Sequence, residues 1–180
     1  MRVRYSALIG LPVCEQEYDE VIGLVSGILV SVDASRVLGF FVRTLSLFSG
    51  GHLFLSTSDI VHLGAKVRVR DVEALAPPEE LIRLQERLDD PRTILGQSMV
   101  TDTGRQLGVC KDVQMDTAEF RIEWLFPRKW FREGTPIHQS SVLKVTDDDI
   151  VVRDPLIREP ASTVETLLPV MEGLGTQALS

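Results

Sequence analysis

The side chains that could perform chemistry are few and widely spaced in this chain. The histidines are His52, His62 and His138, and no His-x-His, His-x-x-x-His or Cys-x-x-Cys spacing occurs. Zinc sites are typically built on such spacings, so the sequence predicts no metal centre. Serines are numerous, but none lies in a Gly-x-Ser-x-Gly motif, and no histidine has a context that marks it as a general base.

Two further patterns resemble ligand sites only superficially. Asp147-Asp148-Asp149 could attract a hard cation, but alternate carboxylates of a strand point to opposite faces, and no Gly or distal Glu completes a calcium loop. A solvated hairpin turn fits this acidic run better. Gly50-Gly51 lacks the Lys and Ser or Thr that follow in a phosphate-binding loop. We therefore expect no catalytic, cofactor-binding or metal site, and no enzyme.

One segment, 126–132, has an unusual composition. It reads Phe-Pro-Arg-Lys-Trp-Phe-Arg and gathers basic and aromatic residues in a chain of net charge -7. Arg and Trp are among the residues most enriched at binding hot spots. The sequence therefore predicts a partner-binding site made by Arg128, Lys129, Trp130 and Arg132.

Composition and charge limit which class of protein this is and which kinds of partner it can bind. An apolar content of 44% and a charged content of 25% are ordinary for a soluble globular protein. The negative net charge argues against bulk affinity for nucleic acid, because phosphate contacts need a positive surface. No apolar run approaches the roughly 20 residues that cross a bilayer, and the first residues show no signal-peptide pattern. These features indicate a cytoplasmic protein.

An internal repeat organises the chain. Ile22-Gly23 and Leu107-Gly108 each precede an apolar run, and Leu8-Ile9-Gly10 and Ile94-Leu95-Gly96 lie upstream of them. The offset of about 83 to 86 residues exceeds that of most solenoid repeats and favours a duplicated small domain. The repeat aligns Cys14 with Val100 and Cys110 with Val25, which predicts that both cysteines are buried apolar residues.

The pattern within each copy is that of short strands. Ranges 21–32 and 37–47 form one predicted hairpin, and ranges 106–115 and 119–126 form the corresponding one. Pro12 favours an edge or bulged strand over 8–14, because proline removes a ladder donor. The repeat also aligns Trp130 and Phe131 with Leu47 and Phe48, so one of the two aromatics could be core. Strand alternation then favours Phe131 inside and Trp130 outside.

Between the copies, residues 78–88 carry a helical pattern, with Leu81, Leu84 and Leu88 on one stripe. We expect a mainly β protein with two tandem small domains, each an all-β barrel or sandwich of about six short strands, joined by a short helical linker. The expected boundaries are 6–72 for the first domain, 73–92 for the linker, 93–154 for the second domain and 155–180 for a loosely ordered tail. We expect each copy, taken as residues 1–74 and 91–156, to fold when expressed alone.

The order of these features resembles the PRC-barrel family, which occurs in the photosynthetic reaction centre H subunit and in a ribosome maturation factor. The matching stretches are 8–13, 22–25 and 37–42 in the first copy, and 94–96, 107–113 and 150–152 in the second. The resemblance covers about residues 6–71 and 93–154. It implies two tandem, small, highly bent six-stranded β-barrels, of a kind that serves as an adaptor or assembly module.

The expected function is therefore that of a non-catalytic adaptor that mediates protein–protein assembly and uses no cofactor. The partner is expected to be a protein, with a second copy of the chain as another option and no membrane span. The alternative is an RNA- or ribosome-associated maturation factor that uses segment 126–132, with bases stacking on Trp130.

Overall fold

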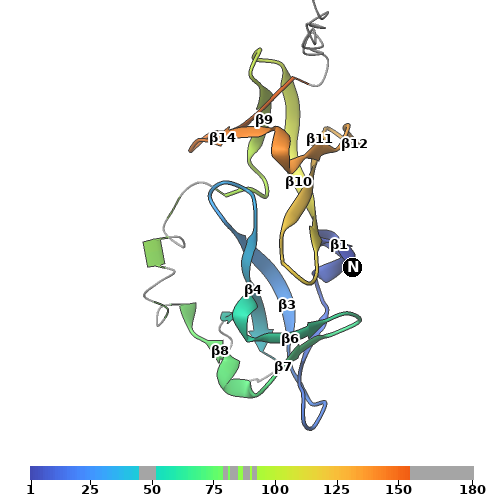
Figure 1. Ribbon diagram of the computed structural model, residues 1–180, viewed down its shortest axis with the longest axis vertical. Helices are drawn as coiled ribbons and strands as arrows, with labels where there is room; N and C mark the ends of the chain where they lie inside the picture. Colours follow the sequence, from blue (N-terminus) through green and yellow to red (C-terminus); the bar gives the residue numbers. More distant parts are fainter. Residues whose placement is uncertain (45–51, 79–80, 82–84, 87–89, 91–92, 155–180) are drawn as a thin grey trace, which may run out of the picture.

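The computed structural model describes residues 1–180 except 45–51, 79–80, 82–84, 87–89, 91–92 and 155–180. The described chain is mainly β and forms two mixed sheets, as the strand patterns predict (Figure 1). The predicted linker helix over 78–88 lies largely outside the described residues; of those described there, Gln85 and Glu86 are α-helical and Pro78 is in a 3-10 turn. The predicted tail also lies outside them.

The first sheet contains seven strands among the described residues, in the order β6-β7-β2-β3-β4-β5-β8. Neighbouring strands are antiparallel except β2 and β7, which are parallel. Their bounds are β2 Pro12–Glu15, β3 Val21–Val30, β4 Val37–Thr44, β5 His52–Ser56, β6 Ile60–Leu63, β7 Val67–Val69 and β8 Leu75–Ala76.

The second sheet contains eight strands in the same described part of the chain, with the central order β12-β11-β10-β9-β15-β14. Here β9 and β15 are the parallel pair. The bounds are β1 Arg2–Arg4, β9 Ser98–Thr101, β10 Gln106–Asp116, β11 Ile122–Lys129, β12 Arg132–Glu133, β13 Ile137–His138, β14 Val142–Val145 and β15 Asp149–Val152. Strands β1 and β13 pair with β10 and β11 respectively.

The predicted repeat appears as the same backbone geometry in both sheets. Gly10 and Gly96 have φ values of +85° and +88°, which residues other than glycine adopt only with strain. The Gly10 N–H donates to the Val25 carbonyl at 2.8 Å, and the Gly96 N–H donates to the Cys110 carbonyl at 2.7 Å. The alignment of Val25 with Cys110 is therefore confirmed, and both cysteines are buried.

The two copies meet through equivalent residues. Arg36 and Arg121 form an antiparallel bridge, and they occupy corresponding positions of the repeat. On either side, the Val37 N–H donates to the Phe120 carbonyl and the Ile122 N–H donates to the Ser35 carbonyl, both at 2.8 Å. Each bond maps onto the other when the copies are exchanged, so the contact has the local symmetry of an isologous dimer interface.

The N-terminal segment crosses from the first copy to the second. Strand β1 pairs with β10, with Val3 opposite Met115, and Figure 1 shows this blue strand beside the yellow β10. The short helix α1 (Tyr5–Leu8) follows. The Ser6 hydroxyl donates to Asp112 at 2.6 Å and the Ser6 N–H donates to the same carboxylate at 3.1 Å. Residues that precede the first predicted barrel therefore complete the second sheet.

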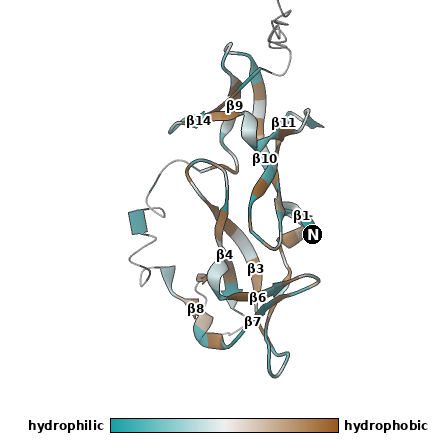
Figure 2. Ribbon diagram, viewed as in Figure 1, coloured by the Kyte–Doolittle hydropathy of each residue, from teal (hydrophilic) through white to brown (hydrophobic). Residues whose placement is uncertain are grey.

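Apolar side chains of both sheets form one connected core. Phe40 of β4 is fully buried, and its ring lies edge-on to Phe120 of the second copy with the centroids 6.2 Å apart. Figure 2 shows brown, apolar stretches along β10 and teal, polar residues at the turn between β2 and β3. Because the core is shared, each copy contributes to burying the other.

Of the two alternatives predicted for β2, an edge strand or a bulged strand, the structure shows the bulged one. β2 lies between β7 and β3, and its register with β3 shifts between Val13 and Cys14. Pro12 is the first residue of the strand, a position at which the missing backbone N–H of proline is tolerated. The proline therefore marks where the strand begins.

The turn between β2 and β3 contains a charge-dependent contact. Asp19 has a φ of +55° and accepts hydrogen bonds from Lys66 at 2.6 Å and from Arg68 at 3.0 Å. The hydrogen bond from Lys66, followed by the attraction of both cations, lowers the pKa of Asp19 below its ordinary value. The contact therefore stabilises the fold above the ordinary aspartate range, and this contribution is lost as the pH falls through the lowered pKa.

Replacing Lys66 with methionine is expected to raise the pKa of Asp19 towards its ordinary value, because the largest cause of its lowering is removed. Carboxyl chemical shifts followed by NMR through an acid titration measure this pKa. Lys144→Met, on the exposed strand β14, is the control and should leave the pKa of Asp19 unchanged. An unchanged Asp19 pKa in Lys66→Met would contradict the assignment.

Candidate functional site

The basic and aromatic residues of segment 126–132 are placed at the tip of a hairpin. β11 and β12 pair antiparallel with Lys129 opposite Arg132, so Trp130 and Phe131 are the two residues of the turn. Trp130 has a φ of +56°. Two-residue hairpin turns favour positive φ at their central residues, which Gly, Asn and Asp normally supply. We call Arg128, Lys129, Trp130, Phe131 and Arg132 the basic-aromatic tip.

Both aromatic side chains of the tip point into solvent. Trp130 is 85% exposed and Phe131 is 89% exposed. The prediction that Trp130 faces outward is confirmed, and the prediction that Phe131 is core is wrong. Alternation of faces applies only within a strand, and the strand ends at Lys129, before the two aromatics. The tip therefore presents two adjacent rings that nothing in the described chain covers.

The cations around these rings are not neutralised within the described chain. Arg128, Lys129 and Arg132 are exposed and form no ion pair there, and the same holds for Lys111 on the neighbouring strand β10. Arg4 differs, because it pairs with Glu133 at 3.0 Å and its guanidinium lies 3.8 Å from the centre of the Phe126 ring. The sequence did not single out Lys111, since only the strand register brings it beside the tip.

A cleft of about 360 Å³ lies at the base of the tip. Phe126, which is 5% exposed, and Phe131 supply its apolar lining. Its polar lining includes Lys111, Arg128 and two carboxylates, Asp112 and Glu133. Asp112 is held by Ser6 and by the Val113 N–H at 2.9 Å. We call this the tip cleft, and it joins an apolar surface to unpaired cations.

His138 and Cys110 have surroundings that indicate structural roles, and His62 lies at the surface. His138 accepts the Ser140 N–H at 3.2 Å at the start of a 3-10 turn, and its ring lies edge-on to Trp124. His62 is exposed on β6. Burial raises the pKa of the Cys110 thiol to about 12, so the reactive thiolate is not formed near neutral pH. Within the described residues, no group of acids, histidines and cysteines could hold a metal ion.

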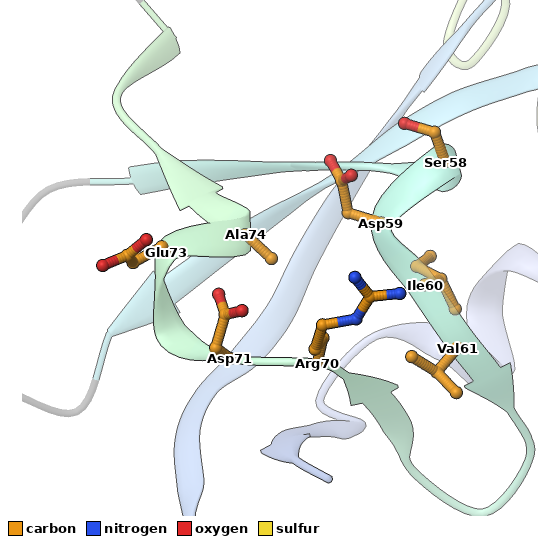
Figure 3. Close-up of a pocket in the computed structure, with 8 residues that line it drawn as sticks. All are labelled: Ser58, Asp59, Ile60, Val61, Arg70, Asp71, Glu73 and Ala74. Atoms are coloured by element: carbon orange, nitrogen blue, oxygen red, sulfur yellow. The ribbon is translucent and has the colours of Figure 1, made fainter.

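An open depression in the first copy gathers charged residues without a catalytic arrangement. Figure 3 shows Arg70 pointing into it, with Asp59 and Asp71 nearby and Glu73 turned away. Arg70, Asp59 and Glu73 are exposed, so water screens their charges strongly. No nucleophile lies against a general base among the residues drawn there. This depression carries no chemistry that we can assign.

Comparison with known proteins finds no family model that matches the chain and no curated protein that matches it. Across the described residues, no helix has the length and apolar character needed to cross a bilayer.

Replacing Trp130 with alanine is expected to change the free energy of unfolding by less than about 1 kcal/mol, as at other surface positions. The indole makes no buried contact, so little packing is lost. Denaturant unfolding followed by circular dichroism measures the change. Phe40→Ala serves as the buried counterpart and should cost about 3 kcal/mol or more. A comparable loss in both variants would mean that Trp130 is part of the core.

Proposed function

We propose that this chain is a non-catalytic adaptor that assembles with a protein partner through the basic-aromatic tip. The observation that carries the proposal is the exposure of Trp130 and Phe131 side by side in a turn with a positive φ. Exposed aromatics flanked by arginine are the composition of binding hot spots. No cofactor is part of this proposal.

We also propose that the two copies are PRC-like barrels, with the boundaries 6–72 and 93–154 and a linker over 73–92. The repeated glycine turns and the matching parallel pairs, β2 with β7 and β9 with β15, support a common fold for the copies. The family's role in assembly supports the adaptor function. The cytoplasmic location and the tail over 155–180 remain predictions.

The alternative function is an RNA- or ribosome-associated maturation factor. The three cations around Trp130 favour it, because aromatic stacking and cationic grooves together bind single-stranded RNA. The net charge of -7 opposes it. Binding that weakens steeply with salt and is destroyed by ribonuclease would support the alternative over the adaptor.

Site-specific photo-crosslinking in native lysate tests the adaptor function. A benzophenone amino acid placed at Phe131 is expected to capture a discrete protein, and this capture should fall when Trp130→Ala is added. The matched control places the same group at Tyr18, which is 71% exposed in the first copy. Equal capture at both positions, or capture that ribonuclease removes, would contradict a protein partner at the tip.

A further inference from the structure

The chemistry of the partner can be inferred from the charges around the tip. Lys111, Arg128, Lys129 and Arg132 lie together and have no ion pair in the described chain, although the protein as a whole is acidic. Elsewhere in the second copy, Arg105 pairs with the buried Asp154 at 2.6 Å and Arg121 pairs with Glu119 at 3.2 Å. A group of unpaired cations on an acidic protein is complementary to a negatively charged partner.

The turn itself points to recognition. A positive φ is an outlier for a bulky residue such as Trp130, and it strains the backbone. Glycine or asparagine would make the same turn without that strain. The tryptophan therefore does not serve the turn, and its exposed ring is available for apolar contact with a partner.

The tip cleft distinguishes between kinds of anionic partner. Its carboxylates, Asp112 and Glu133, line the same space as Lys111 and Arg128, and Arg4, which also lines it, pairs with Glu133. A phosphate surface, whether of lipid or of RNA, would bring continuous negative charge against those carboxylates. A polypeptide carries isolated carboxylates, and its backbone N–H groups can donate to Glu133. The mixed lining therefore fits a protein segment better than a phosphate surface.

Building on the adaptor function, we propose that the tip and the tip cleft bind an acidic protein segment that carries an aromatic side chain. A carboxylate of the segment lies between Lys111 and Arg128. Its aromatic ring packs on Phe131 and Trp130, over the floor that Phe126 provides. No covalent step is involved.

Fluorescence anisotropy with defined polymers tests this proposal on the full chain. The probes are a labelled random copolymer of glutamate and tyrosine, labelled polyglutamate, phosphatidylserine vesicles and oligouridylate. The glutamate–tyrosine copolymer is expected to bind roughly tenfold tighter than polyglutamate at physiological salt, because its rings add apolar contact. Trp130→Ala with Phe131→Ala should abolish that preference. Circular dichroism confirms that each variant is folded.

The charge contribution is tested with two matched double variants. Lys111→Glu with Arg128→Glu is expected to weaken copolymer binding by roughly tenfold or more, as loss of a hot spot does. Arg43→Glu with Arg70→Glu makes the same change of charge on exposed residues of the first copy, and Arg43 is the counterpart of Arg128. This control should retain most of the binding.

Three results would overturn the acidic-segment proposal. They are equal weakening in both double variants, no preference for the tyrosine-containing copolymer, and tighter tip-dependent binding of vesicles or oligouridylate. Protein capture at Phe131 in the crosslinking experiment would still support the adaptor function if the copolymer failed. The two proposals can therefore fail separately.

Discussion

Replacing Gly108 with alanine is expected to destabilise the protein by about 3 kcal/mol or more. Gly108 has a φ of +116°, and a Cβ built there would lie 2.4 Å from the carbonyl oxygen of Arg128 and 2.7 Å from its carbonyl carbon. These are backbone atoms of the paired strand β11, so no side-chain rotation relieves the contact. Denaturant unfolding followed by circular dichroism measures the loss.

Gly104→Ala is the matched control for that substitution. Gly104 also has a positive φ, +84°, but a Cβ there would meet nothing within 4 Å. Only the backbone strain remains, and we expect a cost of about 1 to 2 kcal/mol. An equal loss of stability at the two positions would show that β10 and β11 are farther apart at Arg128 than in the structure.

The duplication could be predicted from the sequence because glycines recur where the backbone has a positive φ or closely approaches a neighbouring strand. Gly10 and Gly96 occur at equivalent turns of positive φ, and Gly23 and Gly108 both face a carbonyl of the neighbouring strand. The central hairpins were also predicted within a few residues. The first was expected over 21–32 and 37–47, and the described strands are Val21–Val30 and Val37–Thr44. Periodicity and turn residues are local signals, and they suffice for local structure.

The geometry of the site could be predicted only in part. The basic-aromatic composition identified the segment, but Trp and Phe favour strands, so nothing in their type indicated a turn at Trp130 and Phe131. The tip cleft depends on the register that sets β10 beside β11, including the shift between Cys110 and Asp112. Register between strands is a tertiary property, and a single sequence does not display it.

Deleting residues 2–5 is expected to destabilise the protein by about 3 kcal/mol, although these residues precede the first predicted barrel. The deletion removes the pairing of β1 with β10 and the packing of Val3 against the core. It also releases Ser6, so the largely buried Asp112 loses donors, which costs about 1 to 3 kcal/mol for a buried polar group and more for a charged one. Unfolding in denaturant gives the size of the change.

Hydrogen exchange then shows where that loss falls. Amides of β10 near Met115 should lose protection, because β1 is their pairing strand, while those of β3 and β4 near Leu29 and Phe41 should keep more of theirs. Ser6→Ala separates the hydroxyl from the strand, since it keeps the backbone donor to Asp112, and should cost only about 1 kcal/mol. A deletion that changes stability by less than about 0.5 kcal/mol would instead mean that the copies are independent. The crossing of β1 argues for dependence, because the second sheet is complete only with a strand that comes from the start of the chain.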